Sequence, residues 1–494
     1  MHILFVYSLH SADSARPVPD WIRAQFGISY ISAVLKAHGH RTRLVVLSTC
    51  DSAASNYRRM EAAIAEFGPS LICFTAIATQ YSLILGAARH LRQNHTRAFL
   101  LIGGVHATLQ PHSVMAGPFD AVCLGEGEYA TLELVGALER GGDPRGIPNL
   151  WIRTAGDHVE KNEARPFLED LDQVPFPDRD MWKPWIRQPD MREAVILAGR
   201  GCPYDCTYCS NHALRRVAAG PYVRMRSAGN ISAEIRHLRA DHPKLRSISF
   251  EVETIAANKR WLLELCDELK RLTSTMPPID YATNLRVSAA SADEELFRAM
   301  AEANFREISI GLESGNERLR KQVLRRDYAN EDFLNAAELA HKYNMRVAVF
   351  NMIGIPGETH AEHMETVRLN RAAKADIDFT CIFFPYPGTE LHKLCREQGL
   401  IGGEDSLADA AAERTRPFLD LPGYSRLEVE RDWIWFAYRV HGGKKNLIIA
   451  LLRSYLVSHP ALRSAVRKLR RIAAPVVASA RATVGHSAGF FHRA

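Results

Sequence analysis

The sequence predicts an α/β protein built from two successive sheets with helices around them, followed by a helical C-terminal region. Three observations predict it. Residues 1–140 alternate short apolar runs with helix-periodic segments, a second alternating series begins at residue 191, and the pattern beyond about residue 390 is helical only. A chain of 494 residues is also too long for one ordinary core, so we expect two or three domains.

The first series predicts a doubly wound, Rossmann-like parallel sheet, and we assign residues 1–145 to this domain. Strand and helix alternate strictly here, which is typical of such sheets. Ligands of doubly wound sheets bind beyond the carboxyl ends of the strands. The loops at 75–80, 103–108 and 125–128 fall there. The expected strands are 2–7, 42–47, 71–75, 98–102 and 121–124.

Residues 146–190 interrupt the alternation. Several prolines and glycines mark an irregular connector. Because it is also rich in aromatic residues, we expect a linker that is docked on its neighbours.

The second series predicts a partial, open (β/α)6 barrel of the TIM type over residues 191–390. Six strand–helix units are too few for a closed eight-stranded barrel. Residues 391–494 are assigned to a helical C-terminal region with a basic tail. The expected barrel strands are 194–198, 246–250, 279–283, 307–311, 346–352 and 377–383.

Three of the nine cysteines share one short loop, immediately after the first barrel strand. Cys202, Cys206 and Cys209 have the spacing CxxxCxxC, whereas the other six are scattered singly in apolar runs. Thiolates in such a group select zinc or an iron–sulfur cluster. A structural zinc site needs a fourth ligand, and only His212 is within reach. The residues alone therefore favour an iron–sulfur cluster and leave zinc open.

The triplet, with an aromatic residue before its last cysteine, resembles the radical S-adenosylmethionine (SAM) superfamily. This resemblance implies that the three cysteines hold a 4Fe–4S cluster whose fourth iron chelates SAM. One electron would then split SAM into methionine and a 5′-deoxyadenosyl radical. Tyr208 would pack over the cluster. Such enzymes need an electron donor, for example a flavodoxin or a ferredoxin.

Later motifs resemble the same superfamily in the right order. The sequence Gly-Leu-Glu-Ser-Gly at 311–315 implies that Glu313 and Ser314 contact SAM. Glu253 would bind the SAM ammonium, although Val252 replaces an acid that relatives carry. Residues 354–358 match a GxPGE turn near the adenine and 385–389 a PYPGT element. Pro-Gly turns end strands in many folds, so we interpret both as mainly structural.

The N-terminal domain resembles the cobalamin-binding domain that precedes many radical SAM barrels. Bulky cofactors need close backbone approach, which glycine loops allow. The chain lacks the Asp-x-His-x-x-Gly motif that supplies a histidine to cobalt, so we expect His106 to be a hydrogen-bonding loop residue instead. The residues implied in cobalamin binding are Thr79, Gln80, Gly103, Gly104, His106, Glu126 and Gly127.

The combined resemblance implies a cobalamin-dependent C-methyltransferase that acts on an unactivated carbon of a small-molecule or lipid-like substrate. A radical SAM oxidative cyclase of the anaerobic porphyrin-ester type is the first alternative. A zinc-bound, non-enzymatic scaffold is the alternative from a different class. The sequence does not identify the substrate.

The C-terminal region is strongly basic. After Asp432 there are eleven lysine and arginine residues and no acidic residue. We expect helices at 429–440, 446–457 and 461–477, the first capping the barrel mouth with its aromatic residues. The basic tail predicts peripheral contact with an anionic membrane surface or, alternatively, a solvated extension. No nucleic-acid-reading module is recognised. The N-terminus begins directly as a strand without a signal peptide, so we expect a cytoplasmic protein.

Overall fold

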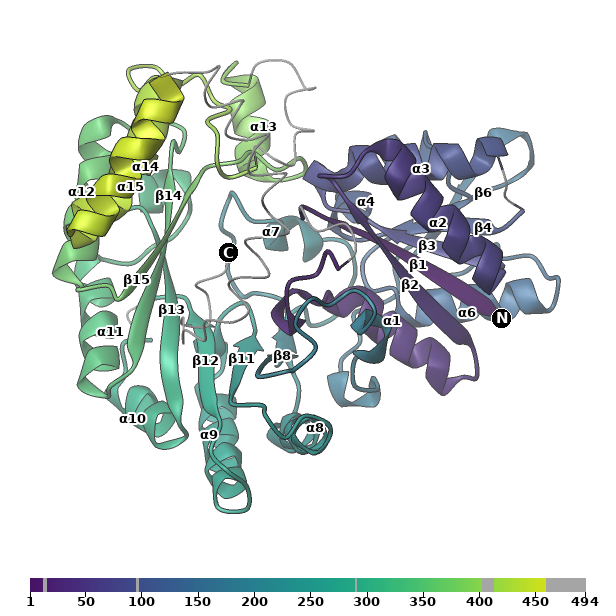
Figure 1. Ribbon diagram of the computed structural model, residues 1–494, viewed down its shortest axis with the longest axis horizontal. Helices are drawn as coiled ribbons and strands as arrows, with labels where there is room; N and C mark the ends of the chain where they lie inside the picture. Colours follow the sequence, from purple (N-terminus) through teal and green to yellow (C-terminus); the bar gives the residue numbers. More distant parts are fainter. Residues whose placement is uncertain (12–15, 95–96, 289–290, 402–412, 459–494) are drawn as a thin grey trace.

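The computed structural model describes residues 1–11, 16–94, 97–288, 291–401 and 413–458. It shows two α/β units side by side, with the N-terminal unit in purple and blue and the barrel unit in teal and green (Figure 1). The helix expected at 461–477 lies outside the described residues.

The N-terminal unit is a sheet of seven strands with helices on both faces. The order is β2-β1-β3-β4-β5-β6-β7, with β1 to β5 parallel and the last two antiparallel. In this order the topological switch point, where ligands bind, lies between β1 and β3. The strands are β1 (His2–Leu9), β2 (Arg41–Ser48), β3 (Leu71–Thr75), β4 (Phe99–Gly103), β5 (Ala121–Cys123), β6 (Leu150–Arg153) and β7 (Val159–Lys161).

Helices cover this sheet because its strands are apolar on both sides. Helices α1 (Phe26–Ala37) and α6 (Glu128–Glu139) pack together on one face. Helices α2 (Ala53–Phe67) and α3 (Tyr81–Asn94) pack together on the other. The short helices α4 (Val105–Leu109) and α5 (Pro111–Met115) follow β4.

The boundary expected at residue 145 is placed too early, since β6 and β7 extend the N-terminal sheet to Lys161. The remaining connector is docked on that sheet. Trp182 is fully buried and its Nε1 donates to Ser29 Oγ over 2.8 Å. Trp185 Nε1 likewise donates to the carbonyl of Leu44 over 3.1 Å.

The barrel unit has six parallel strands in the order β15-β14-β13-β12-β11-β8, which confirms the predicted partial (β/α)6 barrel. A small antiparallel pair, β9 (Gly199–Arg200) and β10 (Arg224–Met225), flanks the cysteine loop. The barrel strands are β8 (Glu193–Leu197), β11 (Ser247–Glu251), β12 (Asp280–Leu285), β13 (Phe305–Glu313), β14 (Arg346–Ile353) and β15 (Ile377–Ile382). The helices are α7 (Asn211–Leu214), α8 (Ala228–Asp241), α9 (Lys259–Thr273), α10 (Glu294–Glu302), α11 (Asn330–Lys342) and α12 (His360–Ala372).

Three helices complete the described chain: α13 (Glu390–Glu397), α14 (Arg426–His441) and α15 (Lys444–Ser458). The expectation that the first aromatic helix caps the barrel mouth is wrong. Helix α14 packs against α12 and β15, at the outer edge of the barrel (Figure 1). Its Trp433 donates from Nε1 to the carbonyl of Thr380 over 2.7 Å and so covers the edge strand. Among the described helices, none combines the length and hydropathy needed to cross a bilayer.

Single-turn helices connect these elements. They are η1 (Trp21–Arg23), η2 (Ala78–Gln80), η3 (Ala155–Asp157), η4 (Leu171–Gln173), η5 (Asp180–Trp182), η6 (Ile255–Ala257) and the π-helical turn η7 (Leu319–Val323).

Candidate cluster and cofactor sites

The cysteine loop leaves β9 through a glycine that no other residue could replace without strain. Gly201 has a φ of +83°, and a Cβ atom there would lie 2.0 Å from the carbonyl oxygen of Tyr222. Beyond it, Arg215 Nη2 donates to the carbonyls of Cys202 and Tyr204 over 2.5 and 3.3 Å. The loop backbone is therefore held in place independently of any bound group.

The three thiols lie among hydrogen-bond donors. Arg286 Nη1 donates to Cys206 Sγ over 2.6 Å, and Asn211 Nδ2 donates to Cys209 Sγ over 3.5 Å. Burial raises the pKa of Cys202 to about 11, and the nearby Cys206 and Cys209 act in the same direction. Three thiols on one short loop, one of them next to a cation, fit the donor set of an iron–sulfur cluster. No three metal-binding side chains among the described residues converge as they would around one ion.

His212, the fourth zinc ligand that the sequence suggests, is already engaged through both ring nitrogens. Its Nδ1 lies 3.2 Å from the carbonyl oxygen of Cys206 and must donate, because a carbonyl only accepts. Its Nε2 accepts from the backbone N–H of Glu390 over 3.2 Å. The ring is buried and tethers the cysteine loop to the start of α13. His212 is therefore structural.

Glu313 is held by a tyrosine and a buried arginine at the end of β13. Tyr208 Oη donates to Glu313 Oε1 over 3.0 Å and accepts from Arg326 Nη1 over 3.0 Å. Arg326 also pairs directly with Glu313 over 3.4 Å. Burial raises the pKa of Tyr208, so its hydroxyl stays protonated and can donate. Glu313 itself has a φ of 66°, where β13 shifts register, a strained conformation of the kind found at functional sites.

The other residues expected at the SAM site differ in exposure. Glu253 is exposed on the loop after β11, near enough to Cys202 and Cys209 to raise both thiol pKa values. Ser314 is fully buried, and its hydroxyl accepts from the N–H of Asn316 over 3.3 Å. The Ser314 hydroxyl therefore caps a turn of its own chain, whereas the sequence motif predicts that it contacts SAM.

The glutamate of the GxPGE turn closes the turn itself, which agrees with a mainly structural role for this motif. Glu358 Oε2 accepts from the N–H groups of Gly354 and Ile355 over 2.6 and 3.2 Å. Burial raises the pKa of Glu358 to about 8, and the two backbone donors oppose that shift only in part.

At the carboxyl edge of the N-terminal sheet, Gln80 lies at the switch point. Ser8, in β1, donates from Oγ to Gln80 Oε1 over 3.0 Å. Thr79 is buried and donates to Glu413 Oε2 over 2.8 Å, so it contacts the C-terminal part of the chain.

The loops after β3 and β4 expose apolar side chains at the same edge. Ile77 is 41% and Val105 39% exposed, and the other exposed large apolar side chains among the described residues lie on α14 and α15. Gly104, which follows Gly103 at the end of β4, has a φ of +94°, and a Cβ atom there would lie 2.7 Å from Thr75 Oγ1. The two loops can therefore approach closely.

His106 lies beside these loops, and burial lowers its pKa to about 4. Its ring packs on Tyr81 with centroids 4.4 Å apart, and its Nδ1 is buried without a partner in the described part of the chain. Exposed apolar groups next to an unpartnered polar atom fit a bulky, largely apolar ligand with a few polar groups.

Glu126 connects the two units. Its carboxylate accepts from Arg200 and Arg224, over 2.9 and 3.0 Å, while Glu128 pairs with Arg200 over 2.6 Å. Burial alone would raise the pKa of Glu126, but the two arginines hold it below its usual value. Its oxygens are therefore committed to ion pairs, a different role from the cofactor contact expected. Gly127 is the N-cap of α6 and lies close to Ile31 of α1.

The two carboxyl edges face each other. Helix α4, which follows the β4 loop, packs against α7, which follows Cys209 (Figure 1). The cysteine loop and the Gly103–Gly104 loop therefore share one region of the molecule.

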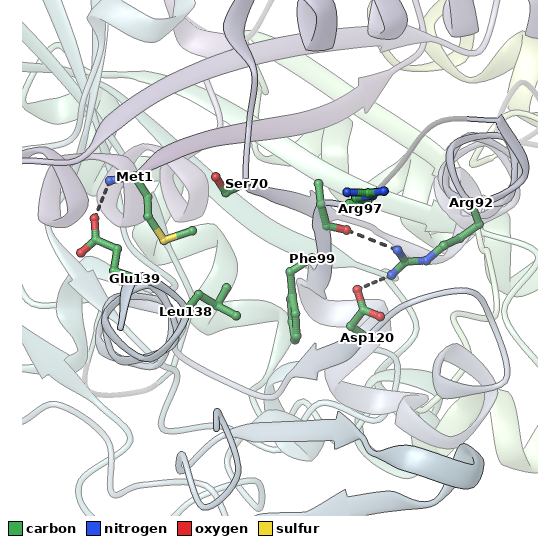
Figure 2. A pocket seen from close by; sticks show the side chains of 9 residues that line it. Met1, Ser70, Arg92, Arg97, Phe99, Asp120, Leu138 and Glu139 are labelled. Carbon is green, nitrogen blue, oxygen red and sulfur yellow. Dashed lines mark hydrogen bonds and ion pairs between the residues drawn. The ribbon is translucent and has the colours of Figure 1, made fainter. Parts of the chain in front are cut away.

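A surface hollow of about 570 Å³ lies elsewhere, at the amino ends of β1, β3 and β4 (Figure 2). Four of its charged groups form two ion pairs: the Met1 amino group with Glu139 over 2.6 Å, and Arg92 with Asp120. It lies at the opposite edge from every predicted site residue of the N-terminal unit.

The arginines of these sites were missed by sequence reasoning. Arg286 directly follows β12 and Arg326 follows η7. A charged residue placed immediately after an apolar barrel strand is the signal that could have identified Arg286. Arg200 and Arg224 carry no comparable signal, because their partners lie in the other unit.

Comparisons with known proteins match the two units to two protein families. A model of the radical SAM superfamily matches residues 196–369, and a model of the B12 binding domain matches residues 24–135. An uncharacterized methyltransferase of Pyrococcus horikoshii is 26% identical over 74% of this chain and 77% of its own length. The anaerobic magnesium-protoporphyrin IX monomethyl ester cyclase of Cereibacter sphaeroides is 24% identical over 81% of this chain and 64% of its own.

Among solved structures, the radical SAM methyltransferase TsrM from Kitasatospora setae, with cobalamin and a [4Fe-4S] cluster bound, superposes with a TM-score of 0.64. The match covers 82% of this chain and 79% of that one at 18% identity, and it supports the fold. Two family models in this order imply a 4Fe–4S cluster, SAM and cobalamin as the cofactors. By these two matches the chain combines a B12-binding domain with a radical SAM domain, as cobalamin-binding radical SAM enzymes do.

Proposed function

We propose that this protein is a cobalamin-dependent radical SAM methyltransferase that methylates an unactivated carbon of a small-molecule or lipid-like substrate. One observation carries the proposal: α4, next to the glycine loop, packs against α7, next to the cysteine loop. A substrate between the two edges would be within reach of both cofactors, which is what methyl transfer to a radical requires.

In this proposal the cysteine loop holds the cluster and the adjoining residues hold SAM. Cys202, Cys206 and Cys209 are the ligands, and Arg286 stabilises the thiolate of Cys206. The cluster supplies the electron that cleaves SAM. Glu313 is fixed by Tyr208 and can accept a hydrogen bond from the SAM amino group.

The β3 and β4 loops would bind cobalamin. Ile77 and Val105 offer apolar contact to the corrin, and Gly104 lets the backbone approach it. Cobalamin supplies the transferred methyl group. Gln80 at the switch point would face the cofactor, while Glu126 would act indirectly by fixing the two units against each other.

The cyclase relative supports a second candidate, because its sequence is similar to this one over 81% of the present chain. An oxidative cyclase would use the same cluster and SAM site without transferring a methyl group. Both candidates need a one-electron donor, for which we propose a flavodoxin or a ferredoxin. The zinc scaffold is no longer a candidate, because the family match implies an enzyme and His212 is committed to the backbone.

Product analysis of the anaerobically loaded enzyme separates these candidates. With SAM and a reductant, a methyltransferase forms S-adenosylhomocysteine as well as 5′-deoxyadenosine, whereas the cyclase forms only the latter. Cys206→Ala should lose the cluster and all 5′-deoxyadenosine formation. Cys266→Ala, a buried cysteine on α9, is the matched control and should retain both. Absence of S-adenosylhomocysteine with every substrate offered would contradict methyl transfer.

A further inference from the structure

Helix α15 exposes apolar side chains instead of burying them. Five of the eight large apolar side chains that are exposed among the described residues lie on this helix. Monomeric soluble proteins rarely gather such residues in one patch without a partner. The exposed face consists of Ile448 (56%), Ile449 (38%), Leu451 (52%), Leu452 (60%) and Tyr455 (54%).

The orientation of α15 is fixed by contacts on its opposite side. Ala450 is buried, and Ser454 accepts a hydrogen bond from Trp435 Nε1 over 2.9 Å. Residues 448, 452 and 455 follow the i, i+4, i+7 spacing of one helical face, and position 450 lies on the other side. The apolar face is therefore turned outward by specific packing on α14.

Positive charge adjoins this face. Lys444 and Lys445 are exposed on the first turn of α15, and Arg453 lies 5.8 Å from the ring centre of Trp433. The chain contains no acidic residue after Asp432, and seven further basic residues follow residue 458. An outward apolar face among cations is complementary to a layer of apolar chains with anionic headgroups.

We propose that α15 lies in the interface of an anionic lipid bilayer, with Ile448, Leu452 and Tyr455 inserted and Lys444 and Lys445 at the headgroups. Because the contact would form on the outer side of the barrel unit, it leaves the carboxyl edges of both sheets free. The inference is independent of the proposed reaction. If the substrate is lipid-like, it would also bring the enzyme to that substrate.

The test compares full-length wild type with the variant Ile448→Gln/Leu452→Gln/Tyr455→Gln. All three side chains are exposed, so the fold should tolerate their substitution by glutamine. Leu427→Gln is the matched control: Leu427 is 66% exposed but lies at the start of α14. We expect wild type and control to sediment with phosphatidylcholine vesicles that contain phosphatidylglycerol, and much less with phosphatidylcholine alone. The triple variant should bind the anionic vesicles at least about tenfold more weakly.

Three results would overturn the proposal. The first is equal vesicle binding by the triple variant and wild type, and the second is no preference of wild type for anionic vesicles. The third is a wild-type dimer in sedimentation velocity that the triple variant converts to monomer, because a second copy would then cover the face. Cleavage of SAM by the loaded triple variant should remain at the wild-type level. The outcome of the vesicle experiment is therefore independent of the outcome of the product analysis.

Discussion

The guanidinium group of Arg286 donates to the sulfur of Cys206 over 2.6 Å, and both side chains are buried. The same guanidinium lies 3.6 Å from the ring centre of Tyr204, within the cysteine loop. A buried cation is costly unless it is paired. The Cys206 sulfur accepts from that cation, so the fold places a positive charge directly against this candidate cluster ligand.

We predict that Arg286→Gln lowers the reduction potential of the reconstituted cluster. Reduction adds negative charge, which a neighbouring cation stabilises, so its removal favours the oxidised form. A loss of about 1.4 kcal/mol corresponds to about 60 mV for one electron. A potentiometric titration followed by paramagnetic resonance measures it. Arg325→Gln is the control, since that side chain is 54% exposed and pairs with Glu390. A similar shift in both variants would show a general charge effect and not a specific contact.

Replacement of Glu313 should weaken SAM binding without loss of the cluster. Glu313→Ala removes a charge-assisted acceptor and leaves Arg326 and Tyr208 without their partner. The expected cost is about 1.5–3 kcal/mol, roughly ten- to a hundredfold in affinity. Equilibrium dialysis of SAM against the loaded variant measures it, with Glu302→Ala, an exposed acid on α10, as the control. An unchanged dissociation constant with an intact cluster would show that Glu313 is only structural.

Local pattern predicted most of the elements, because strand and helix periodicity depend on nearby residues. The strand expected at 71–75 is β3 with the same bounds, and the CxxxCxxC loop follows the first barrel strand as expected. Strands β6 and β7 were missed because they are short and lie between proline and glycine turns. The strand conformation of β6 depends on pairing with β5, and that of β7 on pairing with β6.

Contacts between distant residues could not be predicted. Arg286 and Cys206 are 80 positions apart, and Thr79 and Glu413 are 334 apart. The outward face of α15 is a similar case. The sequence of α15 predicts an apolar helix. It does not predict which side of the helix packs on α14, because that depends on the contacts of Ala450 and Ser454.

Glu126→Gln should loosen the contact between the two units at neutral pH. Arg224 loses its charged partner and Arg200 keeps only Glu128, which we expect to destabilise the protein by about 2 kcal/mol. The carboxylate keeps 20% of its surface exposed, so the cost is below that of a fully buried pair. Urea unfolding measures the difference. Glu133→Gln is the control, because its pair with Arg165 is 48% exposed at the carboxylate and should contribute about 0.5 kcal/mol.

The pH dependence of this effect has a definite sign. The arginines hold the pKa of Glu126 below its usual value. Its contribution is therefore complete above the unfolded-state pKa, near 4.3, and disappears as the pH falls through the folded pKa. Wild type and Glu126→Gln should consequently converge in stability in acid. A difference that grows as the pH falls would contradict the assigned ion pairs.

We predict that the N-terminal unit binds cobalamin without a protein histidine as the cobalt ligand. The chain lacks Asp-x-His-x-x-Gly, and His106 packs its ring on Tyr81 with Nδ1 buried. The paramagnetic resonance spectrum of the cob(II)alamin form should therefore show no hyperfine splitting from a histidine nitrogen. His106→Gln should leave the spectrum unchanged, as should the control His112→Gln on α5, whose ring packs against Trp151. A nitrogen splitting in wild type that disappears only in His106→Gln would identify His106 as the cobalt ligand, and failure of wild type to retain any corrinoid would contradict the cobalamin site itself.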